Sequence, residues 1–322
     1  MVTKYGVISD LHEDPKIIAP ALEILKKEGV KKLLINGDIG HNQDSAAAII
    51  DYIGRSGLES YVQPGSHESI DEFSPVIEYL SNKYSNLIDL TKPENKKLEE
   101  KDHHLVFLPG SDFLCGGEYQ IGNKLPTGTY YLHNNEIMDL NFEQYFQLKS
   151  NGIDINKIES FNMNDLKQQV THPEKTIVVC HVPRKFDNLE TCVDVAKFGE
   201  VTKSFQIGDN KFPKGSVFPL PTAKNLLENW ENAPIEIKHE NRGNEDLKNL
   251  YEELGITKAI TGHFHESSHR ANDSNSNHVP ENTPTNDLFW NSGHLDRGYT
   301  GILTVDGENV SYQNIRLNLE NL

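Results

Sequence analysis

Cysteine is scarce in this chain of 322 residues, and long apolar runs are missing. Three cysteines, Cys115, Cys180 and Cys192, are too few and too widely spaced for a disulfide framework, and none belongs to a C-x-x-C pair. No segment approaches the ~18 consecutive apolar residues of a membrane helix. The first residues, MVTKYGVISD, show neither the basic region nor the apolar stretch of a secretory signal. These absences favour a globular cytoplasmic protein without a membrane partner.

Basic residues are also few compared with acidic ones. The sequence has 31 Lys and Arg against 48 Asp and Glu, a net charge of −17. Such a surface repels polyanions, so long nucleic acid is not expected as a substrate or partner. Small phosphoesters remain compatible with this charge, because bound metal ions can supply positive charge locally. Nothing in the sequence indicates an oligomeric state.

Short apolar runs of strand length alternate with amphipathic stretches in the N-terminal third of the chain. We expect strands at 7–8, 32–35, 60–62, 105–108, 176–179, 259–260 and 288–290. Helices are expected at 17–28, 45–54, 71–83, 162–170, 222–230 and 245–254. The tail predicts two strands, 301–305 and 310–313, joined by Asp306-Gly307. This alternation predicts parallel strands with helical crossovers, and ligands beyond the carboxyl ends of the strands.

Two long segments interrupt the alternation. Residues 111–173 separate two strands by far more than the usual ~2–6 residue connection, which indicates a cap or an insertion. Residues 198–221 are rich in Gly, Lys and Phe and precede a predicted helix. We therefore expect a single domain over 1–322, with an insertion at 111–173.

Side chains that can bind metal follow five of the expected strands. They are Asp10-Leu11-His12, Gly37-Asp38, Gly65-Ser66-His67-Glu68, His181 and Gly262-His263-Phe264-His265. Residues two apart on an extended segment point to the same side, so Asp10 with His12, and His263 with His265, can converge. Carboxylate and imidazole ligands together suit Zn, Mn, Fe or Ni. The small glycines mark places where the backbone turns sharply or approaches a ligand closely.

In this order, the five segments resemble the signature of the calcineurin-like metallophosphoesterase superfamily, D-x-H, G-D, G-N-H-[DE], H and G-H-x-H. The resemblance covers roughly residues 1–300 and implies a four-layered α/β/β/α sandwich of two mixed sheets flanked by helices. It also implies two divalent transition-metal ions, Mn, Fe, Zn or Ni. One ion would be bound by Asp10, His12 and His265, the other by His181 and His263, and Asp38 would bridge them.

The chemistry implied by the resemblance is hydrolysis of a phosphoester by a metal-bridging hydroxide. His67 would stand outside the metal shell and protonate the leaving oxygen. A phosphodiester is favoured because compact bacterial and archaeal members often prefer diesters and because segment 111–173 could cover a larger leaving group. A phosphomonoesterase or protein phosphatase remains an alternative. So does a weakened or inactive binding or scaffold protein on the same fold.

Ser66 departs from the signature, which has a metal-ligating Asn at this position. A Ser hydroxyl would ligate weakly, act through water or leave the second site open, so that site is expected to be the weaker one. Arg184 and Asn291 are candidates for substrate binding, the latter because Asn291-Ser292-Gly293 resembles the family's N-x-G turn. The histidines that fit no ligand pattern are expected on the surface or in loops: His103, His104, His133, His239, His269, His278 and His294.

Overall fold

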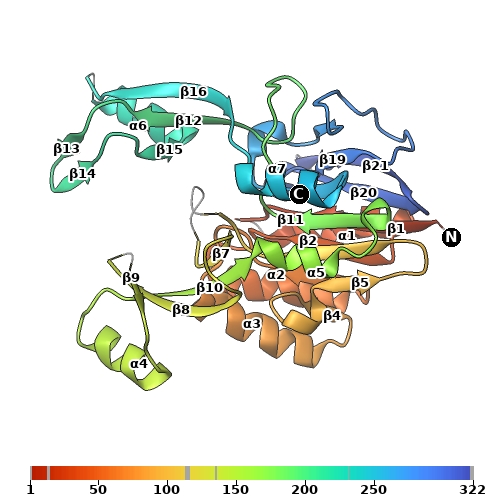
Figure 1. Ribbon diagram of the computed structural model, residues 1–322, viewed down its shortest axis with the longest axis horizontal. Helices are drawn as coiled ribbons and strands as arrows, with labels where there is room; N and C mark the ends of the chain where they lie inside the picture. Colours follow the sequence, from red (N-terminus) through yellow and green to blue (C-terminus); the bar gives the residue numbers. More distant parts are fainter. Residues whose placement is uncertain (1, 13–14, 113–116, 135, 231, 320–322) are drawn as a thin grey trace.

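The structure is a computed structural model that describes residues 2–12, 15–112, 117–134, 136–230 and 232–319 (Figure 1). Cys115 lies outside these ranges. The centre of the protein is built from two six-stranded sheets. In the described part of the chain, each helix is too short or too polar to cross a membrane.

The first sheet has the strand order β21-β20-β1-β2-β3-β4. Its strands are β1 (Thr3–Ile8), β2 (Lys32–Asn36), β3 (Glu59–Gln63), β4 (Leu87–Asp89), β20 (Tyr299–Asp306) and β21 (Asn309–Arg316). The strands β1 to β4 are parallel, whereas β20 and β21 run antiparallel to their neighbours. Val7 of β1 pairs with Leu34 on one side and with Gly301 on the other. The sheet is therefore mixed.

The second sheet has the order β18-β19-β17-β11-β6-β5. Its strands are β5 (Lys97–Glu99), β6 (His104–Leu108), β11 (Thr176–Cys180), β17 (Lys258–Thr261), β18 (Ala271–Asn272) and β19 (Leu288–Asn291). The four inner strands are parallel, and β5 and β18 add antiparallel edges. This sheet is mixed as well.

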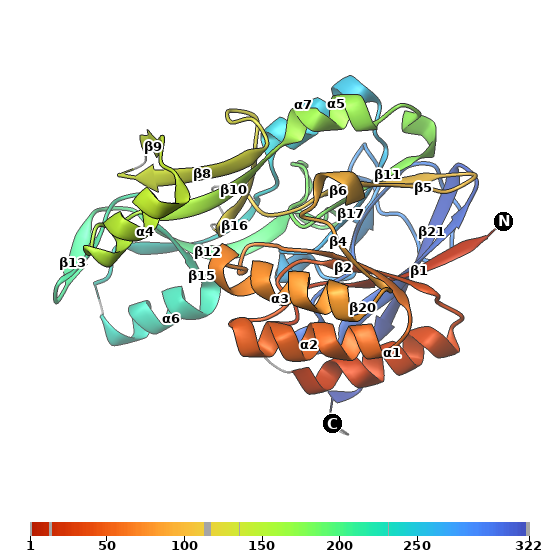
Figure 2. The ribbon, with the colours of Figure 1, turned by 90° about the horizontal axis from the view of Figure 1, so that it is seen from below.

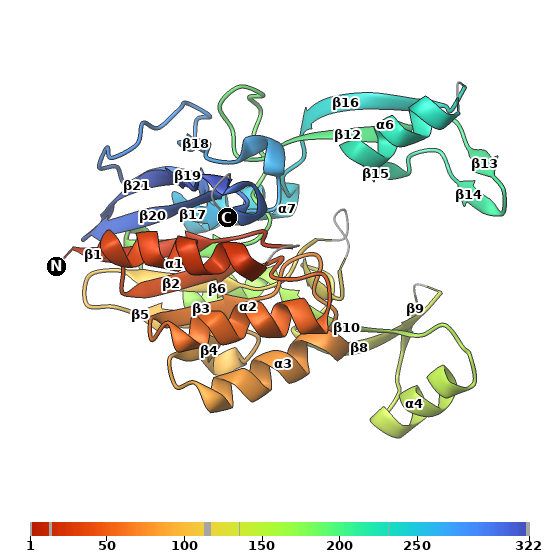
Figure 3. The same cartoon turned by 180° about the vertical axis from the view of Figure 1, so that it is seen from behind.

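Helices cover the outer face of each sheet (Figures 2 and 3). The first sheet carries α1 (Ile18–Lys27), α2 (Gln43–Arg55) and α3 (Ile70–Lys83), and the second carries α5 (Leu166–Gln169) and α7 (Glu245–Leu254). Between the sheets lies a buried cluster that includes Leu34, Phe107 and Trp290. The expected four-layered α/β/β/α sandwich is confirmed.

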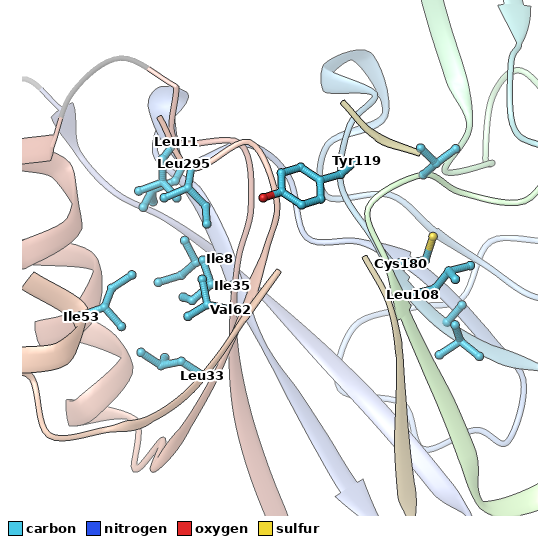
Figure 4. Packing of buried hydrophobic residues seen from close by; sticks show 14 of the residues in the cluster. Ile8, Leu11, Leu33, Ile35, Ile53, Val62, Leu108, Tyr119, Cys180 and Leu295 are labelled. Atoms are coloured by element: carbon cyan, nitrogen blue, oxygen red, sulfur yellow. The ribbon is translucent and has the colours of Figure 1, made fainter. Parts of the chain in front are cut away.

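Strand side chains alternate between the two faces of each sheet. In β2, Leu34 belongs to the cluster between the sheets, whereas Leu33 and Ile35 point toward the helical layer and pack with Ile53 of α2 (Figure 4). Strands buried on both faces need continuous apolar runs, which explains why they stand out in the sequence. Tyr119 lies between the residues of the first sheet and those of the second in Figure 4.

Two lobes project from the same side of the sandwich (Figure 1). The first lobe comprises β7 (Tyr119–Gly122), β8 (Gly128–His133), β9 (Glu136–Met138), α4 (Phe142–Ser150) and β10 (Asn156–Asn162). The second lobe comprises β12 (Val195–Val201), β13 (Phe205–Ile207), β14 (Asn210–Phe212), β15 (Val217–Pro219), α6 (Leu220–Asn229) and β16 (Ile235–Asn241). The first lobe lies within the segment predicted as an insertion, and the second contains the other long interruption.

Candidate metal centre

The carboxyl ends of both sheets' parallel strands meet at one edge of the sandwich. Asp10 and His12 follow β1, and Asp38 follows β2. His181 follows β11, while His263 and His265 follow β17. These six side chains form two groups, Asp10–His12–His265 and Asp38–His181–His263, and the ligand atoms within each group lie within 4.8 Å of one another. Each group thus draws residues from both sheets.

The backbone at these positions is strained. Asp10, His12, Asp38 and His263 have positive φ values of 55°, 32°, 53° and 67°. Side-chain-bearing residues in this region cost about 1–3 kcal/mol each and persist only where the surrounding structure imposes them. The strain is concentrated at candidate ligands, as expected for a site that positions functional atoms.

Glycines allow the loops to approach one another. A Cβ on Gly65 would collide with Asp38 Oδ1, and one on Gly37 would lie 2.7 Å from His181 Nδ1. Gly37 also has a φ of +82°, which a side chain would disfavour. The predicted role of these glycines in close approach is confirmed.

The donor atoms fit a pair of transition-metal ions. His12 Nε2 faces His265 Nε2 at 3.4 Å, and His181 Nε2 faces His263 Nδ1 at 3.3 Å. Asp10 Oδ1 lies 3.3 Å from His265 Nε2, and Asp38 Oδ2 lies 3.2 Å from His181 Nε2. Imidazole nitrogens that converge on each other and on a carboxylate form the mixed N/O set that Zn, Mn, Fe and Ni accept.

In the second group, Asp38 and His181 shift each other's pKa strongly. Burial raises the pKa of Asp38, but the charge of His181 outweighs it and holds this pKa well below its usual value. Burial likewise lowers the pKa of His181, but Asp38 and Asp10 reverse this and raise it to about 10. Burial lowers the pKa of both His12 and His263 to about 4, which leaves these imidazoles neutral at pH 7. Neutral imidazole and ionised carboxylate are the forms that bind metal.

Glu68, the last residue of the third motif, holds two of the loops together. Its carboxylate accepts the backbone N–H groups of Asp38 at 3.2 Å, Ile39 at 2.5 Å and Gly65 at 2.6 Å. Burial and the charge of Asp38 raise the pKa of Glu68 to about 7, against the effect of the N–H donors. Glu68, the acidic residue of the motif, therefore fixes the position of Asp38 through hydrogen bonds to the backbone.

Ser66 and His67 lie beside Asp38. The Ser66 hydroxyl donates to Asp38 Oδ2 at 2.8 Å, and the His67 backbone N–H donates to Asp38 Oδ1 at 3.0 Å. The His67 side chain is 48% exposed, and its Nε2 lies 4.0 Å from Asp38 Oδ2. His67 stands at the open side of the site, where a substrate can reach its ring.

A cavity of about 510 Å³ connects the candidate ligands to the second lobe. His12, Asp38, Ser66, His67, His263 and His265 line it on one side. Phe198, Phe218, Leu220 and Phe264 add apolar surface, and Lys197 and Arg242 add positive charge. The Arg242 guanidinium lies 4.6 Å from the centre of the Phe198 ring. Sequence reasoning missed the contribution of Lys197, Phe198, Phe218 and Leu220 of the second lobe.

Comparison with known protein families decides the assignment. The family described as calcineurin-like phosphoesterase matches residues 3–267. The chain belongs to the calcineurin-like phosphoesterase family. Metal-dependent hydrolysis of phosphoesters at a binuclear divalent metal centre is the chemistry of this family.

Solved structures resemble this chain at low sequence identity. TT1561 of Thermus thermophilus has the same fold and is 11% identical, with a TM-score of 0.50 over 98% of this chain and 100% of that chain. A dimetal phosphatase from Danio rerio is 10% identical, with a TM-score of 0.46 over 98% and 99%. A novel archaeal phosphodiesterase is 14% identical, with a TM-score of 0.28 over 49% and 99%. A comparison with curated proteins found no match.

Both candidate substrate residues of this calcineurin-like phosphoesterase are buried. Arg184 is buried, and its guanidinium packs 4.5 Å from the centre of the Phe186 ring and 4.8 Å from that of Phe289. Asn291 is also buried, and its amide donates to the carbonyls of Gly262 at 3.1 Å and Phe264 at 3.0 Å. Arg184 is thus part of the packed interior, and Asn291 positions the loop that carries His263 and His265.

Three further histidines make contacts that the sequence did not indicate, although His103 and His294 lie in loops, as expected. His103 is buried, and its Nε2 lies 2.7 Å from the Tyr5 hydroxyl oxygen, so it is not a surface residue. His294 stacks on His265, with ring centres 4.1 Å apart. His41, for which no role was predicted, groups with His12 and His67 as a third set of converging ligand atoms. Its position three residues after Asp38, in the same loop, is the signal that could have identified it.

Proposed function

We propose that the protein hydrolyses a phosphodiester of a small molecule at two divalent transition-metal ions. Asp10, His12 and His265 hold one ion, and His181 and His263 hold the other. Asp38 is shared between them, because its Oδ2 lies 3.2 Å from His181 Nε2 and 3.8 Å from His12 Nε2. The observation that carries this proposal is that both ligand groups open, together with His67, into one cavity.

The residues around the proposed ions have different roles. When bound, a pair of divalent ions would supply positive charge that attracts the phosphoryl group and lowers the pKa of a water molecule. Asp38 keeps the two ligand groups together, and Glu68 and Ser66 fix its orientation through hydrogen bonds. His67 Nε2 is free to face the substrate and gives a proton to the leaving oxygen, a step worth about 10²–10⁴ in rate.

The cavity favours a diester over a monoester. It continues past the ligands to the apolar side chains of Phe198, Phe218 and Leu220, so a second organic group on phosphorus has a surface to contact. Burial of such a group supplies about 25 cal/mol per Å² of apolar area. Arg242 and Lys197 can balance the single negative charge of a diester. Long nucleic acid fits poorly, because the net charge is −17.

The test compares bis(p-nitrophenyl) phosphate with p-nitrophenyl phosphate in Mn²⁺-loaded protein. A diesterase should show a higher kcat/KM for the first substrate, and chelation of the metal should abolish turnover. A higher value for the monoester, or for a phosphopeptide, would identify a phosphatase. Metal binding without turnover of any of the three would identify a binding protein on this fold.

A further inference from the structure

A second cavity, of about 240 Å³, lies between the first lobe and the start of α7. Ile121 of β7, Ile158 of β10 and Met163 give it buried apolar walls. Asp112 and Gln120 line it as well, whereas none of the candidate metal ligands belongs to its lining among the described residues. A cavity of about 150 Å³ is enough to admit a benzene ring. The space therefore suits a ring-sized ligand.

Asp112 brings an incompletely paired carboxylate to this cavity. Its side chain is only 4% exposed. Oδ2 accepts from Asn244 Nδ2 at 3.0 Å, but Oδ1 is buried without a hydrogen-bond partner among the residues that the structure describes. A buried carboxylate is unfavourable unless its oxygens are paired, so Oδ1 is open to a donor that the described residues do not supply.

Gln120 brings a second unpaired acceptor. It is 6% exposed, and its Nε2 donates to the Gly117 carbonyl oxygen. Because a carbonyl oxygen can only accept, this contact fixes the orientation of the amide and leaves Oε1 without a partner within the described ranges. Residues 111 and 120 form a β-bridge, which places Gln120 beside the segment that carries Asp112.

The charged residues that line the cavity differ in their exposure to water. Lys124 and Asp246 also line it, but both are exposed at its rim, where water can solvate them. Asp112 is the buried charge among the described lining residues. An incoming cation would thus meet a poorly solvated negative charge, two acceptor oxygens and apolar walls.

We propose that this cavity is a second ligand site, and that it binds a cationic N–H donor group, an amidinium or a similar one, attached to a ring-sized apolar body. Asp112 Oδ1 and Gln120 Oε1 accept the N–H groups, and Ile121, Ile158 and Met163 contact the ring. The site is separate from the metal centre and does not depend on the proposed hydrolysis.

Binding of benzamidine to the metal-loaded full chain tests this proposal by titration calorimetry. Benzoate has the same shape but offers only acceptors, and it should not bind. Asp112→Asn should weaken benzamidine binding at least about tenfold, since hydrogen bonds to charged groups are the strong ones. Gln120→Met should also weaken it. Asp246→Asn removes a carboxylate at the rim of the same cavity and should change affinity less than about twofold.

Thermal melting without ligand separates a binding role from a structural one. Asp112→Asn keeps the size of the side chain and removes a half-paired buried charge, so its Tm should equal or exceed that of the wild type. A clear loss of Tm would make Asp112 a structural residue and overturn the proposal. So would absence of benzamidine binding at millimolar concentration, equal binding to Asp112→Asn, or equal binding of benzoate.

Discussion

At the residue scale, His67 is the side chain whose chemistry can be separated from metal binding. It lies outside both ligand groups of the proposed ions and opens into the cavity. His67→Asn should lower turnover of a diester with a poor leaving group by about 10²–10⁴, with a smaller loss for p-nitrophenolate. Metal content, measured by elemental analysis, should stay the same.

His278→Asn is the matched control, because His278 is exposed and belongs to none of the groups of converging ligand atoms among the described residues. Its kinetics should equal those of the wild type. If His67→Asn lowers the rates with good and poor leaving groups equally, the residue positions or stabilises the substrate and does not deliver the proton.

We expect Ser66 to determine how well the proposed second ion would be held. Its hydroxyl donates to Asp38 Oδ2 at 2.8 Å, so it serves the bridging carboxylate. Ser66→Asn extends the side chain toward the group of His181 and His263 and should tighten the second ion by about 10- to 100-fold, the range typical of supporting residues. Turnover should rise at low metal concentration and change little at saturation. Full occupancy of both sites in the wild type, with no effect of the substitution, would show that Ser serves as well as Asn.

His181 makes metal binding depend on pH. Asp38 and Asp10 raise its pKa to about 10, so in the metal-free protein it is protonated at pH 7. An ion must displace this proton, and the affinity should therefore rise with pH, by about tenfold per unit for one proton released. Competition titrations between pH 6.5 and 8.5 measure the slope. An affinity that does not vary over this range would contradict proton displacement by the metal.

The residue types of the site were predictable, because Asp and His at strand ends are recognisable in order along the chain. Their strained backbone was not, since positive φ at Asp10 or His263 arises from contacts between loops distant in sequence. The burial of Arg184 was not predictable for a related reason. A cation next to a candidate ligand suggests phosphate binding, but Phe186 and Phe289 enclose it in the fold.

At the element scale, the turn after β19 supports the loop after β17. Asn291 donates to two carbonyls of that loop, and the loop supplies His265 to one ligand group and His263 to the other. Asn291→Ala removes both of these hydrogen bonds, at about 0.5–1.5 kcal/mol each, although the Gly262 and Phe264 carbonyls keep the N–H groups of Phe264 and Ser267 as donors. It should lower Tm and weaken both metal ions together.

Asn291→Asp keeps the acceptor for the Gly293 N–H but loses the donors, so its effect should resemble that of the alanine variant. Asn229→Ala, at an exposed position at the end of α6, is the control and should leave metal affinity unchanged. Metal titration and thermal melting of the three variants check this. Unchanged metal affinity in Asn291→Ala would show that the loop keeps its shape without the turn.

The elements of the sandwich were predictable, and so was the helix of the second lobe, since α6 (Leu220–Asn229) matches the helix expected at 222–230; the strands of that lobe were not. Helix α7 occupies 245–254 as expected, because its apolar residues recur at helical spacing. Strand β16 is mostly exposed or half-buried along its length, so it lacks the apolar run or strict alternation that marks a strand. The helix predicted over 162–170 is a 3₁₀ turn, Met163–Asp165, followed by the single turn of α5.

At the scale of the whole molecule, each proposed ion would join the two sheets. Asp10 and His12 from the first sheet meet His265 from the second, and Asp38 from the first meets His181 and His263 from the second. An ion that binds only the folded chain stabilises it by mass action, by about 2.7 kcal/mol at a hundredfold excess over Kd. Mn²⁺ or Zn²⁺ should thus raise Tm, and a chelator should lower it.

Asp38→Asn tests this link between metal and fold, because Asp38 contacts both ligand groups. The variant should lose most of the metal-dependent rise in Tm, since a neutral amide binds either ion more weakly than a carboxylate. Asp209→Asn, which removes an exposed carboxylate in the second lobe, should keep the full rise. Elemental analysis after Mn²⁺ or Zn²⁺ loading should find two ions per wild-type chain. No bound metal after loading, or an equal rise in Tm for Asp38→Asn and the wild type, would rule out a centre that joins the sheets through Asp38.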